Sequence, residues 1–194
     1  MVQPDNTYPT ATSAPKLRRT VVLVGMMGSG KTAIGRALAQ RLGVAYVDSD
    51  AEIEAAAKAT IAEIFEKSGE AFFRDREAEI IARLLQSDPC VLSTGGGAFL
   101  AERNRAAISR HGVSVLLDAD LDLLWERVRH KDTRPLLRTA DPRRTLAEIY
   151  EARRPVYALA DLHASAEPAF SIDEMTDEVL RVLATRPDVL ELPE

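Results

Sequence analysis

The stretch TVVLVGMMGSGKT, residues 20–32, decides the fold. It starts with an apolar run at 21–24, as expected of a parallel strand that is covered on both faces. It ends in the pattern G-x-x-x-x-G-K-[ST], and apolar residues then recur at helical spacing through 34–42. We therefore expect a strand, a glycine-rich loop and a helix that begins close to Lys31, an arrangement that binds the phosphates of a nucleoside triphosphate.

The residues of this loop suit that chemistry one by one. Gly28, Ser29 and Gly30 would form a backbone cradle, because glycines let the chain close around a phosphate without side-chain clashes. Lys31 is long enough to reach the β- and γ-phosphates, and the hydroxyl of Thr32 can ligate Mg²⁺. The alternative is a glycine-rich turn with an incidental lysine.

Composition indicates one enzyme domain and argues against a nucleic-acid or membrane protein. A chain of 194 residues, 46% hydrophobic, can bury roughly 70% of its unfolded surface. The net charge of −5 gives no broad basic field, so we expect no nucleic-acid partner, and no run approaches the roughly 20 apolar residues of a membrane helix. Cys90 is the single cysteine, which suits a reducing cytoplasm. Residues 1–19 lack the apolar core of a signal peptide, and we expect a disordered leader there.

The rest of the chain alternates short apolar runs with helical patterns. Further strand candidates are 44–47, 90–93, 113–117 and 162–165. Apolar stripes at helical spacing start at Leu121 and, after the N-cap-like pair Asp141-Pro142, at Leu146. This alternation predicts an α/β fold, a parallel sheet with helices on both faces, whose ligands bind at the carboxyl ends of the strands.

Two carboxylates follow the strand at 44–47. Asp48 and Asp50 stand two residues apart, so both can face the rim where the triphosphate lies, one near the metal and the other toward the phosphoryl acceptor. The alternative is a helix N-cap with a solvent-exposed carboxylate, because a helical stretch follows. Asp118, at the end of a later strand, is either a rival metal-side carboxylate or a cap for the helix from Leu121.

Three successive glycines, Gly95, Gly96 and Gly97, follow the strand at 90–93. They permit left-handed backbone angles and a close approach of backbone amides to a ligand, which a site for a transferring phosphoryl group would use. A plain tight turn is the alternative.

Two arginines could bind an anionic acceptor. Arg74 is followed three residues later by Glu77, which could hold its guanidinium in place, and Arg153 lies in a second helical segment. A guanidinium fork matches a carboxylate or a phosphate, so the pair would suit an anionic substrate. Taken alone, either arginine would more often be a solvated surface charge.

The polar, basic segment 130–141 contains a proline and interrupts the helical pattern. It predicts a lid whose Arg134 closes on the phosphates and excludes water, without which a kinase would hydrolyse ATP. An ordinary connection between helices is the alternative.

As a set, the motifs closely resemble those of one family, the shikimate kinases. GMMGSGKTAIGRALA, DSD, GEAFFRDRE, STGGG, RPLL and ARRPVY occur in the family's order and at close to its spacing. The resemblance implies transfer of the ATP γ-phosphoryl group to the 3-hydroxyl of shikimate, on the route to chorismate. It also implies a P-loop fold of the nucleoside monophosphate kinase type, with a five-stranded parallel sheet in the order 2-3-1-4-5. The chain would be a monomer, with one kinase domain at 20–186 and a C-terminal tail at 187–194.

On the nucleotide side, the resemblance implies that residues 28–33, from Gly28 to Ala33, hold the phosphates. Lys31 would be catalytic, Thr32 would bind Mg²⁺, and Asp48 would join the metal shell through water. Arg134 would be the lid arginine on ATP. The adenine contacts would come from the region near 164–168, which carries no strong motif.

On the acceptor side, the resemblance makes 50–77 the shikimate-binding segment, lined by Phe65 and Phe73. Asp50 would bind the acceptor hydroxyls and act as the base or orienting group for the attacking oxygen. Three further residues would complete the site: Arg74 and Arg153 would grip the shikimate carboxylate, with Glu77 orienting Arg74, and the Gly96 amide would contact the substrate.

Two other functions remain open on sequence grounds. A related small-molecule kinase, such as a gluconate kinase, would share the loop and the lid but would have no reason to pair Arg74 with Arg153 around a carboxylate. A nucleotide-dependent switch of the GTPase type would need a guanine-reading N-K-x-D segment, which this sequence lacks.

Overall fold

Five parallel strands form the central sheet of the protein, whose computed structural model describes residues 15–130 and 135–192. The strands are β2 (Thr20–Val24), β3 (Tyr46–Asp48), β4 (Val91–Ser93), β5 (Gly112–Asp118) and β6 (Leu162–Ser165). They lie in the order β3-β4-β2-β5-β6 and every neighbouring pair is parallel. Counted along the chain this is the order 2-3-1-4-5, so the predicted fold is confirmed.

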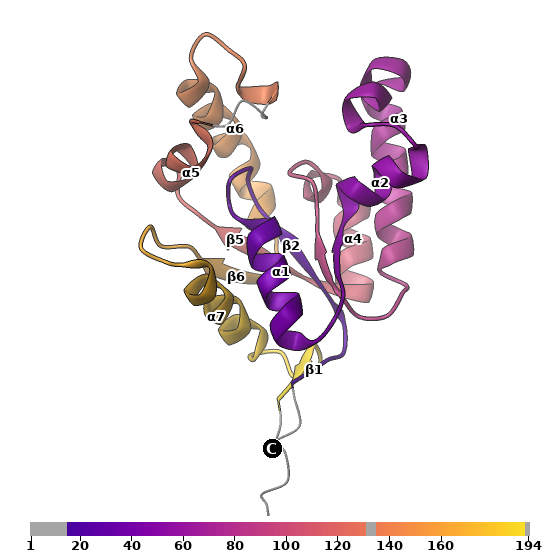
Figure 1. The fold of residues 1–194 in the computed structure, drawn as a ribbon, viewed down its shortest axis with the longest axis vertical. Helices are drawn as coiled ribbons and strands as arrows, with labels where there is room; N and C mark the ends of the chain where they lie inside the picture. Colours follow the sequence, from indigo (N-terminus) through magenta and orange to yellow (C-terminus); the bar gives the residue numbers. More distant parts are fainter. Residues whose placement is uncertain (1–14, 131–134, 193–194) are drawn as a thin grey trace, which may run out of the picture.

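Helices cover both faces of the sheet because its central strand, β2, is apolar on both sides. Val21 and Leu23 pack in a cluster with two helices on one face, and Val22 and Val24 pack in a cluster with four helices on the other. The two are α1 (Lys31–Leu42) and α7 (Ile172–Leu183), and the four are α3 (Ile61–Leu84), α4 (Glu102–His111), α5 (Leu121–Val128) and α6 (Pro142–Tyr157). Figure 1 shows the resulting three layers.

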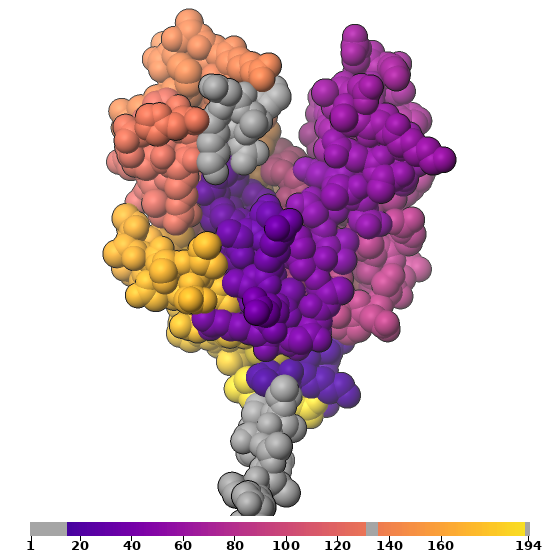
Figure 2. All heavy atoms as spheres, in the orientation of Figure 1, coloured from indigo at the N-terminus to yellow at the C-terminus, as the bar shows by residue number. Residues whose placement is uncertain are grey.

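Two arms rise from the edge at which the strands end (Figure 1). One arm holds α2 (Ser49–Ala57) and the outer part of α3, joined by a small apolar cluster that includes Ile53 and Phe73. Helix α3 is bent at Gly69, which has a φ of 78°. The other arm holds α5, the outer part of α6 and the short 3₁₀ helix η2 (Pro135–Leu137). Figure 2 shows the surface hollowed between the arms, above the P-loop.

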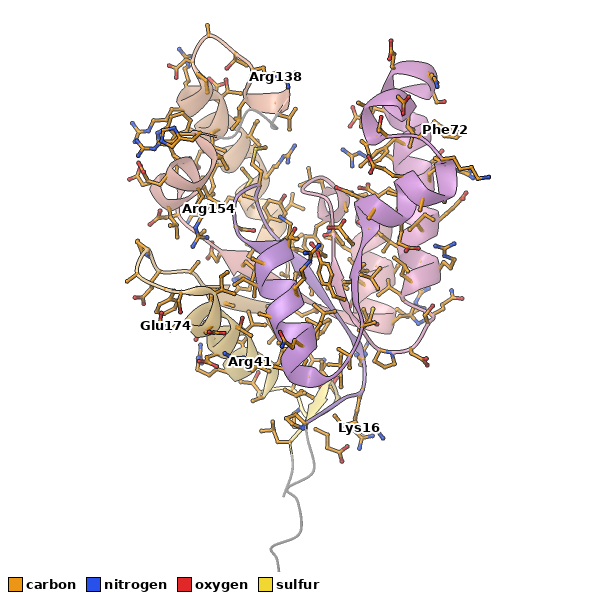
Figure 3. The ribbon with its side chains drawn as sticks, viewed as in Figure 1. Lys16, Arg41, Phe72, Arg138, Arg154 and Glu174 are labelled. Carbon is orange, nitrogen blue, oxygen red and sulfur yellow. The ribbon has the colours of Figure 1, made fainter. Side chains whose placement is uncertain are left out.

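The two ends of the described chain pair with each other, which the sequence did not predict. Strand β1 (Lys16–Leu17) runs antiparallel to β7 (Leu190–Glu191), at the end of the molecule opposite the arms, where Figure 3 labels Lys16. Leu17 and Leu190 are both buried in the cluster around α1 and α7. The expected leader at 1–19 and tail at 187–194 are therefore ordered where these strands lie, while 1–14 and 193–194 fall outside the described residues.

The expected N-cap and proline at the start of the helix after 141 are confirmed. Asp141 caps α6 by accepting from the amide of Arg144, and Pro142 occupies the first turn. Cys90 is buried immediately before β4. In the described ranges, the structure holds no helix whose length and apolarity would let it cross a membrane.

Candidate active site

The loop between β2 and α1 forms the floor of a cavity of about 460 Å³. Gly28 and Gly30 have φ values of 84° and 99°, which residues with a side chain rarely adopt. A Cβ atom at Gly28 would also lie only 2.6 Å from Val128 Cγ1. Gly30 is the N-cap of α1 and supplies no side-chain cap, so the first amides of the helix line the cavity wall. The predicted phosphate cradle is therefore built as a concave backbone surface.

Lys31 and Thr32 open α1 and both line this cavity. The Lys31 ammonium donates to the carbonyl oxygens of Gly25 at 2.7 Å and Met26 at 3.0 Å, both within the loop. Its charge also reaches Asp50, where it opposes the rise in the carboxyl pKa. The lysine thus lies between the loop and the predicted acceptor site.

Asp48 and Asp50 have different environments. Asp48 is the N-cap of α2, since its Oδ1 accepts from the Asp50 amide at 3.0 Å, so the cap part of the alternative reading is right for this residue. Asp50 is no solvated surface carboxylate: its Oδ1 is buried and has no hydrogen-bond partner in the described residues. Burial, then the charges of Asp48 and Glu77, raise the pKa of Asp50 to about 6. Asp50 is therefore a largely buried carboxylate whose pKa is raised, at the edge of the cavity.

The three glycines after β4 touch three predicted site residues in turn. A Cβ atom at Gly95 would lie 2.7 Å from Asp50 Oδ1, and one at Gly97 would lie 2.6 Å from an Arg74 nitrogen, Nη2. At Gly96 the nearest atom would be Arg153 Nη1, at 3.7 Å. None of the three has a positive φ, so the expectation of left-handed angles is wrong. A side chain at Gly95 or Gly97 would clash with the Asp50 carboxylate or the Arg74 guanidinium, whereas a Cβ atom at Gly96 would make an ordinary contact.

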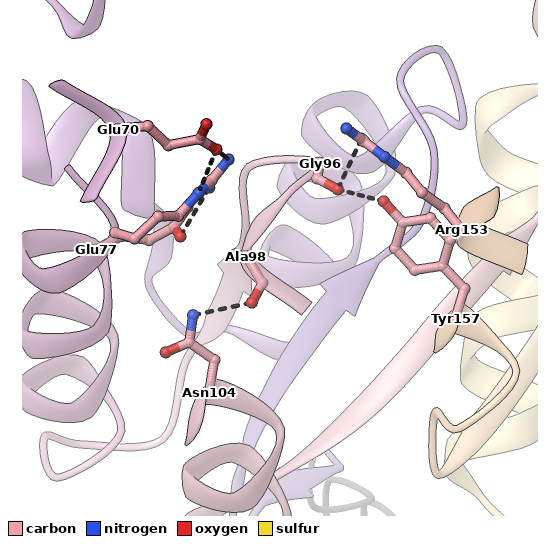
Figure 4. Close-up of polar contacts among 8 residues, drawn as sticks. Glu70, Glu77, Gly96, Ala98, Asn104, Arg153 and Tyr157 are labelled. Atoms are coloured by element: carbon pink, nitrogen blue, oxygen red, sulfur yellow. Dashed lines mark hydrogen bonds and ion pairs between the residues drawn. The ribbon is translucent and has the colours of Figure 1, made fainter. Parts of the chain in front are cut away.

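Arg74 is held from two sides on α3, by Glu70 and Glu77, the two carboxylates that Figure 4 labels. Its Nη1 donates to Glu77 at 2.9 and 3.1 Å, and its Nη2 donates to Glu70 at 3.3 Å. The Glu77 side chain is only 1% exposed, and Arg74 opposes the rise that burial causes in its pKa. The prediction that Glu77 fixes Arg74 is confirmed. The buried carboxylate orients the guanidinium rather than offering itself to a ligand.

Arg153 approaches the same loop from α6. Its Nη1 donates to the Gly96 carbonyl at 3.3 Å, and the Tyr157 hydroxyl donates to the same oxygen (Figure 4). The loop is thereby anchored through its carbonyl, while the expected contact of the Gly96 amide with a substrate stays a prediction. Tyr157 was not found from sequence, because a tyrosine four residues after an arginine on a helix is usual in a core.

Phe65 and Phe73, which were expected to line the acceptor site, pack against each other. Their ring centroids lie 4.7 Å apart, and Phe73 is buried in the small cluster of the α2–α3 arm. The Arg74 guanidinium also lies over the Phe73 ring, with its Cζ atom 5.1 Å from the ring centroid. Phe72 is 45% exposed. These rings support the segment that carries Arg74.

Comparisons with known proteins agree with this geometry. The family model described as shikimate kinase matches residues 27–184. The shikimate kinase of Ruegeria pomeroyi is 69% identical over 179 residues, which cover 92% of each chain, and that of Cereibacter sphaeroides is 60% identical over 92% of this chain and 89% of its own. The chain belongs to the shikimate kinase family.

Solved structures match this family member in fold as well. The shikimate kinase from Acinetobacter baumannii in complex with shikimate superposes with a TM-score of 0.78, at 35% identity, over 86% of this chain and 93% of that one. A gluconokinase from Sinorhizobium meliloti reaches a TM-score of 0.59 at 19% identity, over 88% of this chain and 94% of its own. That second likeness shows a shared fold alone.

Arg127 is a site residue that sequence reasoning missed in this shikimate kinase family member. It extends from α5, lines the cavity, and places Nη1 3.5 and 3.4 Å from the carbonyl oxygens of Gly28 and Ser29. In the sequence it is one polar position of an amphipathic helix, and only the packing of α5 on the loop gives it significance. Arg134, the predicted lid arginine, lies outside the described residues.

The remaining cavity wall is apolar and comes from the start of α7. Phe170, Ile172 and Met175 line it, just beyond the region 164–168 in which adenine contacts were expected. The expected adenine contacts near 164–168 stay a prediction, since strand β6 ends at Ser165 and the lining residues begin at Phe170.

Asp118 has neither of its two expected roles. It is exposed at the end of β5 and does not line the cavity, and the N-cap of α5 is Asp120, whose side chain accepts from the Leu123 amide at 2.7 Å. Thr32 and Asp48, the two residues predicted to lie on the metal side, both line the cavity.

The donor set of this site fits Mg²⁺. A hydroxyl and a carboxylate are hard oxygen donors, which Mg²⁺ prefers. Among the described residues no cluster of three or more His, Cys, Asp or Glu side chains could hold a metal by itself. Such a sparse protein contribution is usual where substrate phosphates and water complete the coordination of Mg²⁺.

Proposed function

We propose that this chain transfers the γ-phosphoryl group of ATP to the 3-hydroxyl of shikimate, giving shikimate 3-phosphate, ADP and a proton. The observation that carries the proposal is the convergence of Asp50, Arg74 and Arg153 on the three-glycine loop 95–97. This loop forms one wall of the cavity whose floor is the P-loop. Asp50 lines this cavity, and the two cations lie against the same loop, where an anionic acceptor could bind beside the phosphates.

At the nucleotide end, the backbone amides of residues 28–33 hold the phosphate oxygens, with the dipole of α1 directed at them. Lys31 moves from its carbonyl partners in the loop to the β- and γ-oxygens, a short displacement for a side chain already in the cavity. Thr32 and, through water, Asp48 would hold Mg²⁺, which would neutralise charge on the phosphates. Arg127, anchored on the loop, adds a positive charge beside the phosphates.

At the acceptor end, Arg74 and Arg153 bind the shikimate carboxylate. Each guanidinium is already fixed, Arg74 by Glu77 and Arg153 by the Gly96 carbonyl, so little side-chain freedom is lost when the substrate binds. A charged hydrogen-bonding partner is worth about 1.5–3 kcal/mol. The pair therefore distinguishes a carboxylated ring alcohol from a neutral sugar.

Asp50 accepts the proton of the attacking hydroxyl. With a pKa of about 6, its carboxyl is ionised in most molecules at pH 7, yet it is a stronger base than an ordinary aspartate. As the new oxygen–phosphorus bond forms, the bond to the ADP oxygen breaks, and the proton passes to Asp50 and then to solvent. Asp50 lines the cavity, and its Oδ1 is buried next to Gly95.

The proposed function also assigns roles to larger parts of the chain. The catalytic domain spans 20–186, with 50–77 as the acceptor-binding segment. The segment 130–141 closes as a lid that brings Arg134 to ATP and excludes water. We expect the protein to act as a monomer in the cytoplasm.

Turnover tests the proposal directly. Purified protein is mixed with Mg-ATP and either shikimate or gluconate, ADP release is followed, and the phosphorylated product is assigned by ³¹P NMR. We expect ADP release to require shikimate and the product to be its 3-phosphate. A preparation of the Lys31→Ala variant controls for contaminating kinases. ADP release that is indifferent to shikimate would contradict the proposal.

A further inference from the structure

Tyr46, in β3, has its ring fixed against α1. A Cβ atom at Gly35 would lie 2.7 Å from the ring atom Cε2 of Tyr46, so α1 can approach the ring closely only because residue 35 is a glycine. On the ring face, the Arg36 guanidinium lies 5.5 Å from the ring centroid. Both contacts come from α1, which holds the ring against that helix and limits where its hydroxyl can point.

The hydroxyl points to the metal side of the proposed site. It donates to Asp48 Oδ2 at 3.3 Å, and the nearby side chains of Ser93 and Thr32 oppose the rise that burial causes in the pKa of Tyr46. The other oxygen of Asp48, Oδ1, accepts from the Asp50 amide at 3.0 Å. Both oxygens of the Asp48 carboxylate are thus restrained, one by the backbone and one by Tyr46.

We propose that Tyr46 is a positioning residue that holds Asp48 and Thr32 in the arrangement that receives the Mg²⁺–nucleotide, an inference that rests on the function proposed above. Without the hydroxyl, Asp48 keeps its cap hydrogen bond, but its carboxylate can rotate about that single contact. Thr32, at the start of α1, loses its link to β3. Removal of a group that orients a metal ligand usually weakens metal binding by about 10- to 100-fold.

Calorimetry with ADP separates this effect from nucleotide binding itself. Wild type and Tyr46→Phe are titrated with ADP in a chelator and again over a range of Mg²⁺ concentrations. We expect Tyr46→Phe to bind ADP normally in the chelator, and to need about tenfold more Mg²⁺ for half of the metal-dependent gain in ADP affinity. Tyr150→Phe, which removes a hydroxyl from α6 outside the cavity lining, is the matched control and should behave as wild type.

A double-mutant cycle shows whether Tyr46 acts through Asp48. In an Asp48→Asn background, Tyr46→Phe should change the Mg²⁺ dependence by less than twofold, because the carboxylate that it positions is gone. An equal effect of Tyr46→Phe in both backgrounds, or an unchanged Mg²⁺ dependence in the single variant, would overturn the inference. Loss of ADP binding in the chelator would assign Tyr46 to the fold and overturn it too. Shikimate-dependent turnover of the wild type reports separately on the proposed function.

Discussion

The substitution Gly97→Ala tests the acceptor site without altering any charged group. The added Cβ atom would lie 2.6 and 2.8 Å from the two terminal nitrogens of Arg74 and 2.9 Å from Cζ, distances that no stable structure keeps. All three atoms are at the far end of a flexible side chain, so the guanidinium will move and the loop need not. The displaced Arg74 leaves the position that Glu77 and the loop define. The fold should therefore survive while the carboxylate contact is lost.

The expected rise in the KM for shikimate follows from the contact of Arg74 that is removed. Loss of one charged hydrogen-bonding partner costs about 1.5–3 kcal/mol, which corresponds to a rise of about 10- to 150-fold in the KM for shikimate. The KM for ATP and the melting temperature should stay close to wild type. Steady-state kinetics of Gly97→Ala, Arg74→Ala and the double variant provide the assay. The double variant should match Arg74→Ala alone; a KM for shikimate within twofold of wild type, or additive losses in the double variant, would refute the reasoning.

Further predictions concern the two ends of the cavity. Lys31→Ala should abolish turnover with an unchanged circular dichroism spectrum, and near-normal activity would remove its phosphate role. Asp50→Asn should lower kcat far more than it weakens ATP binding, and it should remove a fall in wild-type activity as the pH drops through about 6, where Asp50 becomes protonated. Folding raises the pKa of Asp50 above 3.8, so the folded state binds this proton more tightly, and the free energy of unfolding falls as the pH rises from about 4 through 6. Asp50→Asn should accordingly melt higher than wild type at pH 7 but not at pH 4. Glu77→Gln should raise the KM for shikimate by releasing Arg74; a rise confined to ATP would contradict its assigned role.

The sequence predicted the sheet and the catalytic loop because both depend on local patterns. The apolar run 21–24 can only be a strand buried on both faces, and the loop after it has few backbone solutions. Strand ends were equally informative, since parallel strands deliver Asp50 and the glycines 95–97 to one edge of the sheet. Pairing Arg74 with Arg153 required the family resemblance, because no periodicity relates residues on two different helices.

Other features were not predicted from the sequence because they arise from packing between distant segments. Strands β1 and β7 have two residues each, too few for a recognisable pattern, and they exist because Leu17 and Leu190 share one apolar cluster. Arg127 and Tyr46 gain their positions from the way α5 and α1 pack on neighbouring elements. Asp118 was misread for a simpler reason: Asp120 stands two residues later and makes the better cap.

A crystal structure with shikimate and ADP bound tests the central claim most directly. We predict that the shikimate carboxylate lies between the guanidinium groups of Arg74 and Arg153, above the loop 95–97, with Asp50 hydrogen-bonded to the ring hydroxyl nearest the nucleotide. A carboxylate bound away from both arginines, or a ring that presents no hydroxyl to Asp50, would contradict the account.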